Sequence, residues 1–206
     1  MAVCKLAPIN SAMHLMVVRG WWKVGALLLA VTARSNAAVL ITEFMALNNT
    51  TLTDQDGQYS DWIEIYNSGA DTVNLDGWYL TDDSGALTKW RFPATDLFPD
   101  NYLLVFASGK DRAVSGAELH TNFKLAGGGE YLALVMPDGV TVASEYAPEY
   151  PPQRADVSYG LDLQTGQRVF LAFPTPGWAN DANGGGIAEE ASAEIQRSSS
   201  SGEAAA

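Results

Sequence analysis

A short acidic stretch holds the side chains best suited to metal chemistry. Asp54-Gln-Asp56-Gly57 is followed by Asp61 and Glu64. Calcium takes about six to eight oxygen ligands from a compact loop, and an Asp-x-Asp-Gly turn offers two carboxylates and main-chain carbonyls at ligand spacing. No EF-hand is predicted, because the closing bidentate glutamate is out of place. The stretch is interpreted either as a Ca²⁺ site or as a polar loop whose aspartates hydrogen-bond their own backbone.

Aromatic and basic side chains form a second candidate site. If Tyr59, Tyr79 or Trp90 faces outward, its ring can stack on a sugar or a peptide. Lys89 and Arg91, together with Lys110 and Arg112, make up half of the eight cations beyond residue 37. On a shared face these side chains predict a binding surface for a protein or a surface polysaccharide. The alternative is a solvated strand edge protected by charge.

Catalysis is not predicted. Ser108, His120 and an aspartate contain the groups of a hydrolytic triad, but no serine lies in a nucleophile elbow, so a structural histidine is favoured. Asp82 and Asp83, with Asp76, suit turns better than a second cation site. The formal net charge is −12, and residues beyond 37 hold eight cations against all 24 acids. Nucleic-acid phosphates should repel so acidic a surface.

Residues 1–37 have the features of an export signal. Arg19 and Lys23 lead into an apolar run at 24–31, and small residues follow at Ser35 and Ala37. We expect cleavage after Ala37 or Ala38, with translation starting at Met1, Met13 or Met16. A run of about eight residues is shorter than the roughly 20 that a spanning helix needs. The prediction is a secreted or cell-surface protein with no stable membrane span after cleavage, and the alternative is an uncleaved anchor.

Alternating apolar residues between glycine turns predict how the candidate sites are positioned. Trp62, Glu64 and Tyr66 alternate with Ile63 and Ile65, and turn signals recur along the chain. This pattern is typical of an all-β sandwich of about 8–10 short antiparallel strands. Residues 181–206 lack aromatic residues and are predicted to be a disordered tail or linker. The segments expected to be extended are 39–46, 61–67, 72–75, 78–81, 87–92, 102–108, 119–125, 130–136, 140–146, 157–160 and 168–172.

An ordered series of motifs resembles the lamin-tail domain family, in particular its bacterial secreted branch. The series is ITEFMALNN, DQDGQYSDWIEIYNSG, NLDGWYLTDD, TKWRFP, YLLVFASGKDR, LHTNFKL, GGEYLALVMPDG and PTPGWAN. The resemblance implies an immunoglobulin-like β-sandwich over residues 38–180. It also implies a docking role like that of nuclear lamins, or an accessory role beside exported catalytic domains. Unlike lamins, the chain has no heptad rod and no basic localisation cluster, so a nuclear scaffold role is not expected.

These observations predict a secreted, non-catalytic module for adhesion or protein docking. The alternative is an accessory domain of a secreted hydrolase or kinase-like protein whose catalytic part lies on another segment. Function inferred from so widely used a fold rests on analogy, so it must be supported by the residues of a specific site.

Overall fold

A computed structural model describes residues 39–180, and these residues contain strands and turns but no helix. The predicted signal peptide and tail lie outside the described residues. No helix in the described part is long and apolar enough to cross a membrane. The strands are β1 Val39–Met45, β2 Asp61–Asn67, β3 Val73–Asn74, β4 Tyr79–Thr81, β5 Trp90–Arg91, β6 Asp96–Leu97, β7 Tyr102–Ala107, β8 Leu119–His120, β9 Leu132–Val135, β10 Val142–Tyr146, β11 Ser158–Leu161 and β12 Arg168–Leu171.

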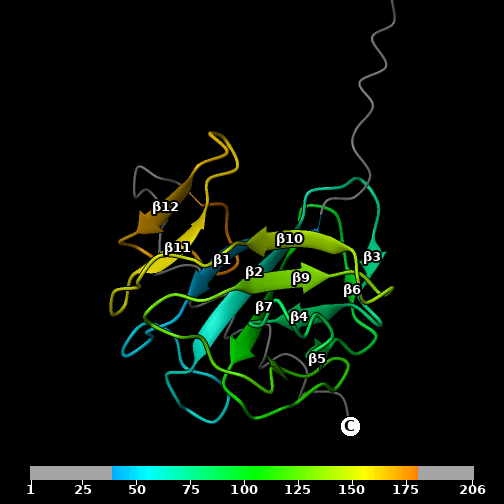
Figure 1. The fold of residues 1–206 in the computed structure, drawn as a ribbon, viewed down its shortest axis with the longest axis horizontal. Helices are drawn as coiled ribbons and strands as arrows, with labels where there is room; N and C mark the ends of the chain where they lie inside the picture. Colours follow the sequence, from blue (N-terminus) through cyan, green and yellow to red (C-terminus); the bar gives the residue numbers. More distant parts are fainter. Residues whose placement is uncertain (1–38, 181–206) are drawn as a thin grey trace, which may run out of the picture. The chain divides into compact units, whose positions relative to one another are not determined.

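Two sheets pack face to face around one apolar core. The larger sheet has the order β12-β11-β1-β2-β7-β8, and the smaller has the order β10-β9-β4-β5. Figure 1 shows β9 and β10 in front of β1, β2 and β7. Side chains from both sheets fill the space between them, which confirms the predicted immunoglobulin-like sandwich. The core includes Phe44, Ile63, Ile65, Leu80, Phe92, Val105, Leu132, Leu134 and Tyr146.

The alternation in β2 decides which side chains face the core. Ile63 and Ile65 point between the sheets, whereas Trp62 belongs to a smaller apolar cluster with Met45, Leu52 and Phe106. Successive side chains of a strand point to opposite faces, so this cluster lies on the outer face of the larger sheet. Leu52 comes from the loop between β1 and β2, which therefore covers this part of the outer face.

A β-bulge in β1 determines which of its side chains face the core. Strict alternation from Ile41 would direct Glu43 into the core and Phe44 out of it. The register shifts at this point, so that Ile41 pairs with Ile65 but Glu43 pairs with Glu64. The extra residue, Thr42, turns Glu43 to the outer face and returns Phe44 to the core.

Three details differ from the predicted strand arrangement. The short turn at 68–71 predicts that the segment at 72–75 forms a hairpin with 61–67, but β3 pairs with β6 in a separate two-stranded sheet. Strand β8 runs parallel to β7, in contrast to the all-antiparallel expectation. Only two residues of the expected strand at 119–125 belong to a strand, because the chain then bends at Asn122 and Phe123.

Candidate functional site

The acidic loop between β1 and β2 is built around Asp54. Its Oδ1 accepts hydrogen bonds from the main-chain N–H groups of Asp56 and Gln58, both at 3.0 Å, and Ser60 Oγ donates to its Oδ2 at 2.8 Å. Lys110 Nζ lies 2.5 Å from Asp54 Oδ2. The Asp54 carboxylate is fully buried, while Lys110 retains limited exposure. Asp54 therefore organises the loop and pairs with a cation from the segment after β7.

Asp56 extends this pairing at the surface. Its Oδ2 lies 2.7 Å from Lys110 Nζ and 2.8 Å from a guanidinium nitrogen of Arg112. Hydrogen bonds from Arg112 and then Lys110 lower the pKa of Asp56 to about 2. Burial opposes ionisation of Asp54, but hydrogen bonds from Lys110, Gln58 and Ser60 outweigh it and lower the pKa of that carboxyl. We call Asp54, Asp56, Lys110 and Arg112 the ion-paired corner.

A second pair of carboxylates lies on the outer face of the larger sheet. Glu43 and Glu64 are Cα partners across β1 and β2, and both are 0% exposed. Within residues 39–180, no Lys, Arg or His nitrogen lies within 4 Å of either carboxylate. Burial raises the pKa of Glu43 to about 7. Burial and then the neighbouring Glu43 raise the pKa of Glu64 well above its usual range.

Hydrogen-bond donors replace cations around this pair. The Ser158 hydroxyl donates to Glu43 Oε1, the Thr175 N–H lies 3.1 Å from the same oxygen, and the Thr175 hydroxyl lies 2.9 Å from Glu43 Oε2. Thr42 Oγ1 donates to Glu64 Oε1 at 2.7 Å, and the Gly177 N–H donates to Glu64 Oε2 at 2.6 Å. We call Glu43 and Glu64 the buried glutamate pair.

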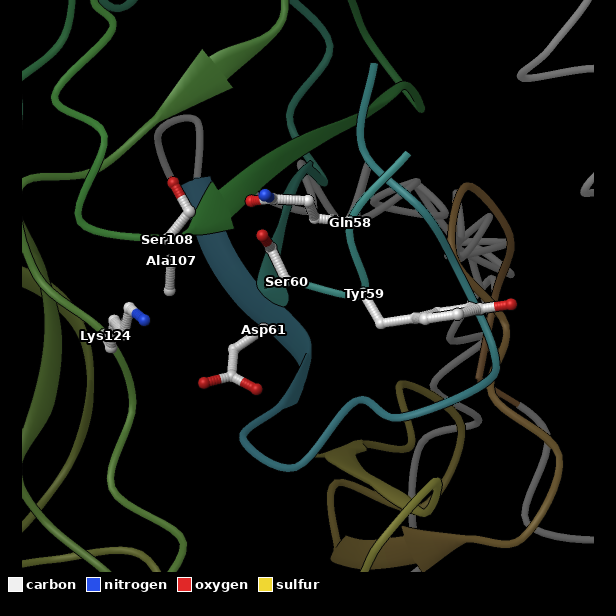
Figure 2. A pocket seen from close by; sticks show the side chains of 7 residues that line it. All are labelled: Gln58, Tyr59, Ser60, Asp61, Ala107, Ser108 and Lys124. Carbon is white, nitrogen blue, oxygen red and sulfur yellow. The ribbon is translucent and has the colours of Figure 1, made fainter. Parts of the chain in front are cut away.

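A pocket of about 170 Å³ opens where β2 begins and β7 ends. In Figure 2 the Lys124 ammonium points toward the Asp61 carboxylate, and the Tyr59 ring points away from both. Burial raises the pKa of Asp61 to about 6, against the lowering effects of the Asn48 N–H and of Lys124. We call this hollow the corner pocket, and it is lined by Gln58, Tyr59, Ser60, Asp61, Ala107, Ser108 and Lys124.

Ser108, His120 and Glu118 form a hydrogen-bonded chain behind this pocket. Ser108 Oγ lies 2.9 Å from His120 Nδ1, and His120 Nε2 lies 2.8 Å from Glu118 Oε1. Because the Glu118 carboxylate can only accept, His120 Nε2–H donates to it. Nδ1 of the neutral imidazole then accepts the Ser108 hydroxyl proton, and Ser108 Oγ accepts the Lys110 N–H. His120 is 0% exposed and stacks on Phe106. The Ser108 hydroxyl points away from Asp61 and Lys124 (Figure 2), so this chain attaches β8 to β7.

Comparison with known families agrees with this fold. The family model described as Lamin Tail Domain matches residues 32–148. The chain belongs to the lamin tail domain family. No curated protein and no solved structure matches. Lamin tail domains are immunoglobulin-like protein-interaction modules and generally non-catalytic. The matched residues include the corner pocket and both glutamates, but end before β11, β12 and Thr175.

This lamin tail domain does not gather the four carboxylates predicted to bind calcium. Asp54 and Asp56 lie in the ion-paired corner, Asp61 faces the corner pocket, and Glu64 belongs to the buried glutamate pair. Within the described part of the chain, no group of three or more His, Cys, Asp or Glu residues is placed to hold a metal ion. The four carboxylates therefore do not share one site in this structure, because Asp61 and Glu64 point to opposite faces of β2 and Lys110 pairs with Asp54 and Asp56.

The predicted aromatic and basic surface is also divided. Trp90 is 2% exposed and packs edge-on against Phe92, so the prediction that it faces outward is wrong. Lys89 pairs with Asp82 at 2.5 Å, and Arg91 pairs with Asp76 at 3.0 Å. Two further aromatic side chains from this prediction remain accessible, and they lie on different elements: Tyr59 in the loop before β2 and half-buried Tyr79 in β4.

Sequence reasoning missed Glu43, Lys124 and Glu118 as members of these sites. Glu43 had a detectable signal, since a glutamate interrupts the apolar run from Val39 to Met45. Lys124 had none, because only the path of the chain after β7 brings it to the pocket. Glu118 had a weak local signal, since it stands two residues before His120 in the sequence.

Proposed function

We propose that this chain is a secreted, non-catalytic binding module of the bacterial lamin-tail type. It docks a protein or a surface polysaccharide at the corner pocket. The observation that carries the proposal is the polar lining of this pocket: Asp61 and Lys124 face one hollow without forming an ion pair within 4 Å.

The pocket suits one polar group of a larger partner. A volume of about 170 Å³ leaves room for a single side chain or sugar unit. Asp61 accepts hydrogen bonds when ionised, Lys124 donates them, and the Gln58 amide can do both. Tyr59 is 50% exposed beside the pocket and offers an aromatic surface to the rest of the partner. These features favour polar recognition with limited apolar burial.

The absence of catalysis is part of the proposal. The triad-like chain of Ser108, His120 and Glu118 supports it, because the imidazole is buried and the hydroxyl is already used as its hydrogen-bond donor. A nucleophile needs a reacting carbon within reach of its free lone pair. His120→Ala would therefore destabilise the domain without abolishing binding to a partner.

Export is tested separately. The basic residues, apolar run and small residues of 1–37 support secretion. Expression of the whole chain in a secreting bacterial host, followed by N-terminal sequencing of the exported protein, should find a new N-terminus at Ala38 or Val39. Retention of the chain in the cytoplasm with an intact N-terminus would contradict this part of the proposal.

Binding is tested with arrays of bacterial polysaccharides and of extended peptides, probed with labelled protein. Asp61→Asn and Tyr59→Ala should weaken a captured signal at least tenfold, the equivalent of about 1.4 kcal/mol. Phe98→Ala is the matched control, because Phe98 is a similarly exposed aromatic residue that does not line the pocket. A signal that Phe98→Ala removes and Asp61→Asn does not would place binding elsewhere.

A further inference from the structure

The buried glutamate pair holds a C-terminal segment, residues 175–180, which we call the strap. Thr175 contacts Glu43 through both its N–H and its hydroxyl, and the Gly177 N–H donates to Glu64. Asn180 Nδ2 donates to the carbonyl oxygens of Thr42 at 2.7 Å and Leu161 at 3.0 Å. The two carboxylates are therefore central to the attachment of the strap to the sheet.

Hydrogen-bond geometry places a proton on this pair. Thr175 Oγ1 lies 2.9 Å from Glu43 Oε2 and also 2.9 Å from Asn180 Oδ1. A hydroxyl has one proton, and the Asn180 amide group already donates to two carbonyls, so two acceptors would compete for one donor. A proton on Glu43 Oε2 resolves this, because Glu43 then donates to Thr175 and Thr175 donates to Asn180.

No other group nearby is suited to neutralise the pair. The titratable side chain that shares the outer face with the pair is Tyr102 on β7. Tyr146 of β10 lies on the core side of β1, where its hydroxyl donates to the Ile41 carbonyl, and burial raises the pKa of each phenol above its usual range. They stay neutral throughout the physiological range. Ionisation of both glutamates would place two like charges opposite each other in a buried site, which is strongly unfavourable.

We propose that the buried glutamate pair is a pH-sensitive latch, which holds the strap against the larger sheet while protonated and releases it when both carboxylates ionise. Release uncovers Thr42, Glu43 and Glu64 on the outer face of β1 and β2. It also detaches residues 175–180 from the sheet. The inference does not depend on ligand binding at the corner pocket.

The direction of the pKa shifts determines the pH range in which the strap is released. A carboxyl whose pKa is higher in the docked state binds its proton more tightly there. The docked strap is thus most stable at acidic pH, and its stability falls as pH rises from about 4.5, the usual pKa of glutamate, through the docked value of about 7 for Glu43. We expect release above neutral pH, in the opposite direction to acid denaturation.

The test follows the strap in the purified protein by carbon-detected NMR between pH 5.5 and 8.5, so that amide exchange does not interfere. The Thr175 methyl signal and the Gly177 Cα signal should move to the positions of an unstructured peptide above neutral pH, while core signals stay dispersed. Glu64→Gln leaves one carboxylate and keeps an acceptor for Gly177, and should hold the strap docked at pH 8.5. Glu130→Gln, a half-buried glutamate elsewhere whose pKa is also raised, should behave as wild type.

Two results would overturn the latch. One is a wild-type strap that keeps its docked signals at pH 8.5. The other is release that persists unchanged in Glu64→Gln. If Glu64→Gln does not fold, the carboxyl carbon signals of Glu43 and Glu64 in the wild type decide instead, because titration of both near pH 4.5 would exclude the latch and titration near or above pH 7 would support it.

Discussion

The ion-paired corner and the buried glutamate pair each bring two carboxylates together, but they neutralise the charge differently. Asp54 and Asp56 share Lys110, and Arg112 joins them at the surface. Glu43 and Glu64 have only hydrogen-bond donors around them. The pKa is lowered for both aspartates and raised for both glutamates. Carboxylate clusters in one small domain thus respond to pH in opposite directions, according to whether a cation is within reach.

The largest effect should come from Glu43→Ala, which removes the acceptor for the Thr175 N–H and the Ser158 hydroxyl. Each buried donor left without a partner costs roughly 1–3 kcal/mol, so we expect a loss of about 4 kcal/mol in the free energy of unfolding. Urea denaturation at pH 5 measures it, because repulsion within the pair is then small. Exposed Glu149→Ala is the control and should change stability little. Equal losses in the two variants would show that Glu43 is not structural.

The next effect is the pH dependence of stability. The pKa of Glu43 is higher in the folded state, so the folded protein binds more protons and its stability falls between about pH 4.5 and pH 7. A shift of this size corresponds to roughly 3 kcal/mol at most. Urea denaturation at pH 5 and pH 8 should show the loss in the wild type and a smaller one in Glu43→Gln, which removes this titrating group. Equal or higher stability at pH 8 than at pH 5 would contradict the raised pKa of Glu43, because Asp54 and Asp56, whose pKa values are lowered, do not titrate in this window.

A smaller loss is expected for Lys110→Met, which leaves the buried Asp54 carboxylate without its cation. Three hydrogen bonds to Asp54 remain, so we expect a cost of about 2 kcal/mol at pH 7, between the values typical of exposed and buried pairs. The cost should shrink below pH 4, as Asp54 becomes protonated. Lys124→Met, which breaks no ion pair among the described residues, serves as the control. Similar losses in both variants at pH 7 would contradict the role of Lys110.

Calcium should have the smallest effect. Lys110 and Arg112 occupy oxygens of Asp54 and Asp56, and Asp61 and Glu64 lie apart from them. We expect the same Tm in EDTA and in millimolar calcium. A ligand at about 100 times its Kd would add roughly 2.7 kcal/mol and raise Tm by several degrees. Such a shift, if abolished by Asp56→Ala, would restore the predicted calcium site and require displacement of Lys110.

Local patterns predicted most of the extended segments, because period-two alternation and glycine turns are short-range signals. They did not predict the partner of β3 or the parallel β8, since strand pairing depends on the path of the whole chain. Trp90 shows the same limit. Its neighbours Lys89 and Arg91 are charged and point outward, but composition alone does not tell which face of a short strand meets the core.

The sequence by itself determined the all-β class, the family and the acidic character, because these depend on residue types, their alternation and their order along the chain. Only the tertiary structure decided what each acidic side chain does. Lys110 reaches Asp54 across 56 residues, and Thr175 reaches Glu43 across 132. A carboxylate becomes an ion pair or a proton-binding group according to the charges and donors that folding brings within a few ångströms, and sequence spacing does not encode those distances.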